Sequence, residues 1–199
     1  MLAIAWDVDD VLNDLMRSWF ENYWLSGHPN CRLAFDDLKE NPPHAILGVT
    51  QKEYLASLDA YRLSEAAGQM QPNPELLIWF QKYGGSFRHI ALTAAPLKTA
   101  HISAYWVLKH FGVWIRTFHF VPSGRDHEEI PVYDNSKSEF LQWIEKVDLL
   151  IDDSARNIEE AQKIGIRGIL VSRPWNIDGY SIQEVIHILT EAEIKGFLD

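Results

Sequence analysis

Residues 2–14 have the sequence Leu-Ala-Ile-Ala-Trp-Asp-Val-Asp-Asp-Val-Leu-Asn-Asp, in which an apolar run changes abruptly to acids. Residues 2–6 contain no turn former and predict a buried strand, whereas Asp and Asn are poor strand formers. The strand therefore ends before Asp7, Asp9 and Asp10. Because ligands of open α/β sheets bind outside the carboxyl ends of the strands, acids at this point indicate a site.

The same acids also have a purely structural explanation, as the loop before a helix that begins near Asp14. Asn and Asp side chains accept hydrogen bonds from the free amides of a first helical turn, and Asn13 or Asp14 would serve that purpose. One cap still leaves Asp7 and Asp9 without a role. The rest of the sequence is needed to distinguish a helix cap from a functional site.

Composition limits the class of protein and its partners. The 199 residues, 47% hydrophobic and 23% charged, suit one well-packed domain or a core with a modest insertion. Cys31 is the single cysteine, and the sequence contains neither a secretory leader pattern nor a membrane-length apolar run, so we expect a cytoplasmic protein without a membrane partner. The net charge of −10 argues against a nucleic-acid polymer as partner. A small phosphorylated substrate stays compatible, because a cation bound by carboxylates reverses the local potential.

Residues 15–72 predict a small, mainly helical insertion. Residues 15–25 place apolar side chains at spacings of three and four, which is helical periodicity. Thr50 and Glu53 form a capping-box pattern that opens a helix through Leu58, and residues 62–68 favour a further short turn of helix. Pro42-Pro43 and Pro72-Asn73-Pro74 break the helical patterns, and the insertion shows no convincing alternating strand.

From residue 73 onward, strand and helix patterns alternate, which calls for parallel strands with helices on both faces of the sheet. Ser136 and Glu139 form a second capping box at the start of one of the helices. The expected strands are residues 88–92, 117–121, 147–151 and 168–171, and the expected helices are 74–83, 96–111, one from Ser136 and 155–164. We therefore expect an α/β fold, a Rossmann-like, three-layer, doubly wound parallel sheet. Its core would comprise residues 1–14 and 73–199, with residues 15–72 as a helical cap.

Four polar signals stand where these strands end or these helices begin. They are Asp7-Val8-Asp9-Asp10-Val11, Thr93, Lys137 and Asp152-Asp153. Each signal alone has an ordinary explanation: a strand-end hydroxyl for Thr93, a solvated helix residue for Lys137 and a helix cap for the acidic pair. If the strands are parallel, however, all four point into one crevice. Their joint occurrence favours a site.

In this order the four signals resemble the motifs of the haloacid dehalogenase-like superfamily, from residue 2 to about residue 176. That pattern is Asp-x-Asp-x-Thr/Val after the first strand, then Thr or Ser, then Lys, then an acidic pair that ends a strand. The stretch LLIDDSARNI at residues 149–158, with GILV at 168–171 and RPWN at 173–176, resembles the 5'-nucleotidase and deoxyribonucleotidase branch most. Position 10 departs from that branch, which usually has Gly where this chain has Asp10.

The resemblance implies a Mg²⁺-dependent phosphomonoester hydrolase that acts through an aspartyl-phosphate. Asp7 would be the nucleophile. Asp9 would protonate the leaving alcohol and then deprotonate water, and its backbone carbonyl would bind the metal beside Asp7 and Asp152. Dehalogenases on this fold lack an acid two residues after the nucleophile, so Asp9 favours phosphoryl transfer.

The other implied roles concern the phosphate and its charge. Thr93 and the amide of Ala94 would donate to phosphate oxygens, and Lys137 would offset the negative charge. Asp153 would act through water or orient Lys137, behind the metal ligands. Asn157 would support the acidic pair or lie at the surface as an ordinary amide.

The substrate expected from the resemblance is a nucleoside 5'-monophosphate, with a sugar phosphate or another small phosphorylated metabolite next. Arg125 follows a predicted strand and could contact the substrate. Four aromatic residues of the insertion, at helical spacing, fit a core, and one ring could stack on a nucleobase; they are Trp19, Phe20, Tyr23 and Trp24. The alternative is a non-catalytic phosphate-binding or regulatory protein that retains the fold, because fold and motif do not establish turnover.

Overall fold

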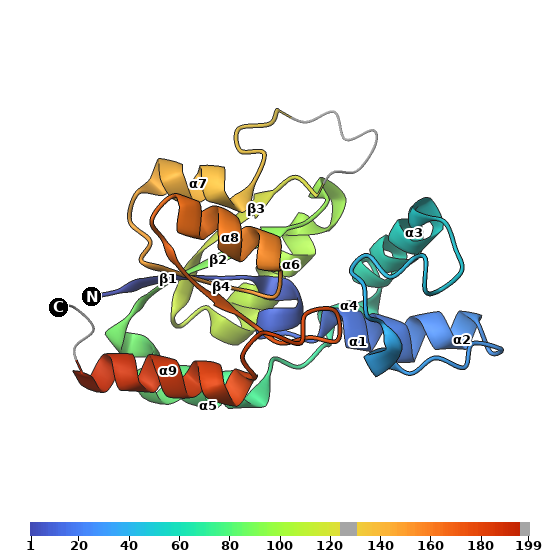
Figure 1. Ribbon diagram of the computed structural model, residues 1–199, viewed down its shortest axis with the longest axis horizontal. Helices are drawn as coiled ribbons and strands as arrows, with labels where there is room; N and C mark the ends of the chain where they lie inside the picture. The colour runs from blue at the N-terminus through green and yellow to red at the C-terminus, as the bar shows by residue number, and fades with distance from the viewer. Residues whose placement is uncertain (124–130, 196–199) are drawn as a thin grey trace.

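The computed structural model describes residues 1–123 and 131–195, so the suggested contact of Arg125 lies outside the described residues. Strands and helices alternate from Arg88 onward, whereas the segment between the strand Ala3–Trp6 and the strand Arg88–Ala94 contains helices only (Figure 1). In chain order the elements are β1 (Ala3–Trp6), η1 (Val8–Leu12), α1 (Leu15–Trp19), η2 (Phe20–Trp24), α2 (Leu25–Gly27), η3 (Phe35–Asp37), α3 (Gln51–Arg62), α4 (Glu65–Gly68), α5 (Pro74–Tyr83), η4 (Gly84–Ser86), β2 (Arg88–Ala94), α6 (Leu97–Phe111), β3 (Ile115–Val121), α7 (Lys137–Ile144), β4 (Leu149–Asp152), α8 (Ala155–Lys163), β5 (Arg167–Leu170) and α9 (Ile182–Lys195).

The five strands form one parallel sheet in the order β3-β2-β1-β4-β5, which confirms the predicted fold class. In β1, all four residues are buried, as expected for a strand covered on both faces. Ala5 pairs with Ile90 of β2 on one side and with Leu150 of β4 on the other. The acids that follow β1 therefore lie at the middle of the carboxyl edge of the sheet.

Helices cover both faces of the sheet and complete the three layers. On one face Trp6 packs with Trp79 and Phe80 of α5 in a cluster that also includes residues of α6 and α9. On the other face Leu92 packs in a cluster with Phe140 of α7 and residues of α8. Figure 1 shows α5 and α9 side by side below the sheet, with α7 and α8 above it. Within the described ranges, no helix is both long and apolar enough to cross a membrane.

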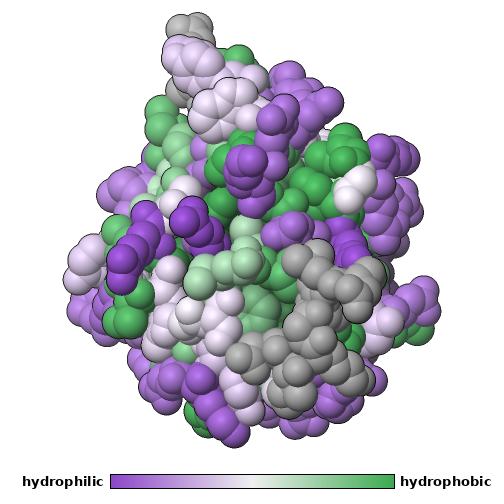
Figure 2. All heavy atoms as spheres, turned by 90° about the vertical axis from the view of Figure 1, so that its left-hand side faces the viewer, coloured by the Kyte–Doolittle hydropathy of each residue, from purple (hydrophilic) through white to green (hydrophobic). Residues whose placement is uncertain are grey.

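Helix α9 had no counterpart among the predicted elements. Its buried residues Val185 and Leu189 complete the core on the α5 face. The helix opens on Ser181, whose hydroxyl accepts from the Glu184 amide while the Glu184 carboxylate accepts from the Ser181 amide. Figure 2 views the end of the molecule on the left of Figure 1, where hydrophobic side chains gather in the middle of a largely hydrophilic face.

The segment after β1 is the predicted helical insertion, and it has a hydrophobic core of its own. The cluster contains Trp19, Trp24, Tyr54 and Tyr61 among its buried residues. Thr50 and Glu53 form the predicted capping box, but α3 continues to Arg62 rather than ending at residue 58. The helix is longer because Tyr61 lies on the same face as Tyr54, seven residues earlier, and both are buried in this cluster.

The predicted second capping box is only half formed. The Ser136 hydroxyl accepts from the Glu139 amide at 3.2 Å, as predicted. The Glu139 carboxylate, however, accepts from the Asn135 amide at 2.7 Å, one residue before the expected amide of Ser136. The serine still fixes the first turn of α7, which begins at Lys137.

Close packing of β5 against α8 gives a test of the core. A Cβ atom added at Gly168 of β5 would lie 2.6 Å from Cγ2 of Ile158, whereas one added at Gly27 in the insertion would meet nothing within 4 Å. We expect Gly168→Ala to lower the free energy of unfolding by about 1–3 kcal/mol, because the packed neighbours of Gly168 cannot move far enough to accommodate the added methyl group without strain. Gly27→Ala, the matched control, should leave it unchanged or slightly raised. Urea denaturation followed by circular dichroism measures both, and equal stabilities would contradict the packing.

Candidate active site

Lys137 lies between two buried carboxylates at the carboxyl edge of the sheet. Its Nζ is 2.9 Å from Oδ1 of Asp7 and 2.7 Å from Oδ2 of Asp152. Asp7 directly follows β1, where its amide donates to the carbonyl of Ile151 in the neighbouring β4. Asp152 is the last residue of β4 and is fully buried. Two adjacent strands and the start of α7 thus place three charges in contact.

Asp153 belongs to the same cluster. Carboxylate oxygens of Asp7, Asp152 and Asp153 all lie within 4.8 Å of one another. The resemblance placed Asp153 behind the expected metal ligands, whereas its carboxylate lies within 4.8 Å of both Asp7 and Asp152. Asn157 lies one helical turn further on, and its Nδ2 donates to Asp152 at 3.0 Å. Of its two expected positions, Asn157 therefore occupies the one that supports the acidic pair.

The cluster holds more negative charge than its one ammonium balances. Burial raises the pKa of Asp7, and Lys137 opposes that rise while Asp152 and Asp153 add to it. Burial also raises the pKa of Asp153 to about 7, helped by the charge of Asp152. Burial alone would lower the pKa of Lys137, but the charges of Asp152 and Asp7 outweigh it and raise that pKa. Lys137 is therefore the charged partner of Asp7, an acid whose ionisation burial opposes.

Such a cluster fits a divalent cation. Three oxygen ligands are the donor set that Mg²⁺ prefers, and a second positive charge would relieve the surplus of buried carboxylates. The residues that would hold the cation are Asp7, Asp152 and Asp153. The backbone carbonyl of Asp9 is the further ligand expected from the resemblance.

The side chain of Asp9 is held from two sides. Its Oδ2 accepts from Nη2 of Arg62 at 2.9 Å, and its Oδ1 accepts from Nδ2 of Asn13 at 3.3 Å. Arg62 is the last residue of α3, so the insertion reaches the candidate site through this guanidinium. The sequence analysis missed Arg62, because a contact across 53 residues leaves no spacing pattern. Asn13, predicted as a helix cap, does accept from the Leu15 amide at 3.0 Å.

Asp10 occupies a backbone position that favours glycine. Its φ of 63° lies in the left-handed region, which glycine adopts most readily and Asp tolerates better than bulkier residues do. In this chain the Asp10 carboxylate accepts from the Met16 amide at 3.0 Å, and its carbonyl accepts from Nε of Arg173 at 2.6 Å. Burial raises the pKa of Asp10 to about 7. Asp10 thus joins the loop after β1 to the first turn of the insertion.

The cluster opens into a cavity of about 180 Å³ whose wall includes the predicted Thr93 and Ala94. Outward lies a cleft of about 520 Å³, which shares Tyr54, Arg62 and Lys137 with the inner cavity. Tyr54 is the one aromatic residue among the described residues that line these two spaces. The four aromatic residues considered for base stacking lie elsewhere: Trp19, Phe20 and Trp24 are buried in the insertion, and Tyr23 packs on Tyr61.

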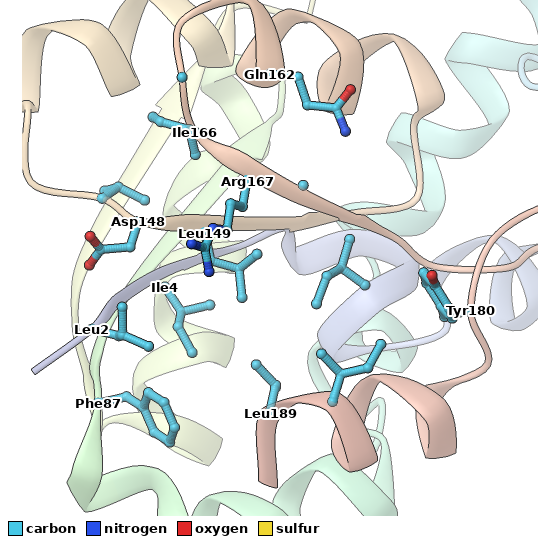
Figure 3. Close-up of a pocket in the computed structure, with 15 residues that line it drawn as sticks. Leu2, Ile4, Phe87, Asp148, Leu149, Gln162, Ile166, Arg167, Tyr180 and Leu189 are labelled. Carbon is cyan, nitrogen blue, oxygen red and sulfur yellow. The ribbon is translucent and has the colours of Figure 1, made fainter. Parts of the chain in front are cut away.

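A larger cavity of about 700 Å³ lies at the opposite, amino-terminal edge of the sheet (Figure 3). Its walls are mainly apolar, with Ile4 and Leu189 among them. Its carboxylate, Asp148, accepts from the Ala3 amide at 2.7 Å and so serves the start of β1. This cavity lies away from the carboxylate cluster, which is where the chemistry-bearing residues converge.

Comparison with known proteins places the fold. No protein-family model matches the chain, and no curated protein matches it. A haloacid dehalogenase-like family hydrolase from Streptococcus pneumoniae matches with a TM-score of 0.57 and 13% identity, over 94% of this chain and 90% of that one. A structure described as a predicted phosphatase from Clostridium acetobutylicum gives 0.60 and 14%, over 96% and 98%. A subfamily IA hydrolase of the same superfamily from Geobacter sulfurreducens gives 0.54 and 14%, over 95% and 96%.

The chain has the haloacid dehalogenase-like fold. The three matches span both the core and the insertion, so the likeness covers nearly the whole chain. Identities near 14% establish the fold and leave the activity to be argued from the site. None of the three structures is described as a nucleotidase, so the narrower resemblance gains no support from them.

The carboxylate cluster predicts a pH-dependent response to Mg²⁺. At pH 8 we expect Mg²⁺ at a hundred times its Kd to raise the free energy of unfolding by about 2.7 kcal/mol. At pH 5.5 the gain should be much smaller, because Asp153, with a pKa of about 7, then holds a proton that the cation must displace. Urea denaturation at both pH values, with and without Mg²⁺, measures the difference.

Without the cation, ionisation of Asp153 lowers the free energy of unfolding as pH rises. The folded protein binds the Asp153 proton more tightly than the unfolded chain, where the ordinary pKa is 3.8, so this contribution to stability is lost as pH rises from about 4 to 7.

Asp7→Asn should remove most of the Mg²⁺ gain, and Asp36→Asn, at an exposed acid of the insertion, should keep it. A full gain in Asp7→Asn would exclude the cluster as the cation site.

Proposed function

We propose that this protein is a Mg²⁺-dependent phosphomonoester hydrolase acting through an aspartyl-phosphate at Asp7. The observation that carries the proposal is the buried bridge of Lys137 between Asp7 and Asp152, with Asp153 in the same cluster. The arrangement holds a carboxylate nucleophile next to fixed positive charge at the carboxyl edge of the sheet. The match in fold to a haloacid dehalogenase-like family hydrolase and to a structure described as a predicted phosphatase supports this proposal.

The first step transfers the phosphoryl group to the protein. Oδ of Asp7 attacks phosphorus, the bond from phosphorus to the ester oxygen breaks, and its electron pair stays on that oxygen. Asp9 donates a proton to the departing oxygen, so the leaving group departs as a neutral alcohol. Thr93 and the Ala94 amide line the inner cavity, where they would donate to the phosphate oxygens.

The second step returns the protein to its starting state. Water attacks the phosphorus of the aspartyl-phosphate, Asp9 takes a proton from that water, and the Asp7 carboxylate leaves as inorganic phosphate forms. Lys137 balances the negative charge on Asp7 in both steps. A bound Mg²⁺ supplies charge neutralisation, which lets two anions approach each other.

The insertion would exclude bulk water and choose the leaving group. Amides and hydroxyls line the outer cleft, Asn41, Gln51, Asn135 and Ser136 among them. A nucleoside 5'-monophosphate belongs to the substrates to be tested, but none of the four rings expected to stack its base lines the cleft or the inner cavity. The polar cleft favours a small phosphorylated metabolite with a hydroxylated leaving group, such as a sugar phosphate.

Release of inorganic phosphate tests the catalytic assignment. We expect the protein with Mg²⁺ to hydrolyse members of a panel of sugar phosphates, nucleoside monophosphates and p-nitrophenyl phosphate. Asp7→Asn should lose all release above background, because an amide cannot form the aspartyl-phosphate. Asp178→Asn, at an exposed acid after β5, is the control and should keep full activity. Phosphate binding with no turnover by the wild-type protein would favour the non-catalytic alternative.

The role of Asp9 predicts a dependence on the leaving group. Asp9→Asn should slow hydrolysis of an alkyl phosphate by about 10²–10⁴-fold, because the alkoxide needs a proton to depart. p-Nitrophenyl phosphate, whose phenolate leaves without a proton, should lose far less in the phosphorylation step. Single-turnover phosphorylation rates with the two substrates provide the comparison. Equal losses on both would mean that Asp9 is not the acid.

A further inference from the structure

The loop between β5 and α9 is closed on itself by backbone contacts. Its ends meet where the Ser172 amide donates to the carbonyl of Tyr180 at 2.8 Å. At its tip the Arg173 amide donates to Oδ1 of Asn176 at 2.7 Å, and the Asn176 amide returns to the carbonyl of Arg173 at 2.9 Å. The RPWN stretch noted in the sequence therefore forms a tight turn that presents its side chains in fixed directions.

One side chain of this turn touches both the carboxylate cluster and the insertion. Nε1 of Trp175 donates to Oδ2 of Asp153 at 2.9 Å. The same indole packs edge-on against Phe35 of η3, with ring centroids 6.1 Å apart, and joins the hydrophobic cluster of the insertion. Asn176 adds a bond from Nδ2 to the carbonyl of Asp153.

Arg173 ties the same turn to the start of the insertion. Its Nη1 is 2.9 Å from Oδ1 of Asp14, the residue before α1, and its Nε bonds the carbonyl of Asp10. Figure 1 shows the orange-red segment before α9 passing beside α1. The turn thus contacts the insertion at Phe35, the residue Asp14 just before the insertion, and the carboxylate cluster at Asp153.

We propose that Trp175 is a positioning residue that orients Asp153 for cation binding and is itself held in place by the insertion. The indole N–H fixes one oxygen of Asp153, which leaves the other for the cluster. Partners behind a metal ligand set its orientation, and their loss typically weakens metal binding by about 10–100-fold. Because the indole also packs on Phe35, displacement of the insertion would release Asp153, and by reciprocity a bound cation would stabilise the seated insertion.

This inference rests on the cation site of the proposed function, and cation binding without turnover tests it. Electron paramagnetic resonance of free Mn²⁺, which takes the same oxygen ligands as Mg²⁺, gives the Kd. We expect Trp175→Phe, which keeps a ring for Phe35 and removes the N–H, to raise the Mn²⁺ Kd about 10–100-fold. Trp143→Phe, at an exposed tryptophan of α7, should leave the Kd unchanged.

Hydrogen exchange tests the connection to the insertion. Added Mg²⁺ should slow amide exchange in η3 of the wild-type protein and should do so much less in Trp175→Phe. Phe35→Leu, which leaves the N–H of Trp175 intact, should also raise the Mn²⁺ Kd. It carries the test if Trp175→Phe fails to show wild-type circular dichroism.

Two outcomes overturn the inference: a wild-type Mn²⁺ Kd in Trp175→Phe, or exchange in η3 that does not respond to Mg²⁺ in the wild-type protein. The proposed function fails separately. A wild-type protein that releases no phosphate, while Trp175→Phe weakens Mn²⁺ binding, would remove the hydrolase and keep the role of Trp175.

Discussion

The structure depends on one buried ammonium. Lys137 is enclosed with Asp7 and Asp152, and taking any of these charges out of water costs several kcal/mol unless the others stay within bonding distance. Parallel pairing of β1 with β4 supplies that proximity, because it sets Asp7 beside the end of the strand that carries Asp152. The half-formed cap at Ser136 then starts α7 at the residue that has to reach them. Asp153 adds a third carboxylate to the cluster, and Lys137 is the ammonium that bonds Asp7 and Asp152 there.

The sequence predicted the core of this site because strand ends are visible in it. Asp7, Thr93 and Asp152 each follow or end an apolar run, and parallel topology requires such residues to meet. Helix α9 was missed although Ser181 and Glu184 carry a capping-box spacing, the same signal that located α3 correctly. A local capping pattern therefore indicates the start of α9 as it does that of α3.

Other residues of the site carried no such signal. Arg62 and Trp175 reach Asp9 and Asp153 across long stretches of chain, through packing that neither periodicity nor spacing encodes. Asp10 was noted among the acids after the first strand and as a departure from a resembling pattern, but its contacts carried no signal in the sequence. Its left-handed backbone typically costs a non-glycine residue about 1–3 kcal/mol, less for Asp than for bulkier side chains. The hydrogen bonds from Met16 and Arg173 offset that strain. Asp10 thereby connects the loop after β1 to the insertion and to the turn that contains Arg173.

These contacts make the relation between core and insertion reciprocal. Arg62 of the insertion donates to Asp9 of the core. Trp175 of the core packs against Phe35 of the insertion, and its indole N–H donates to Asp153. The acid assigned to the leaving group and an acid of the cation cluster are therefore both oriented by groups whose positions depend on how the insertion sits. Arg62 lines both the outer cleft and the inner cavity, whereas Asp7 lines the inner cavity alone. The orientation of Asp9 and Asp153 thus depends on the position of the insertion. Two side chains make this connection: Arg62 extends from the insertion to the core, and Trp175 extends from the core to the insertion.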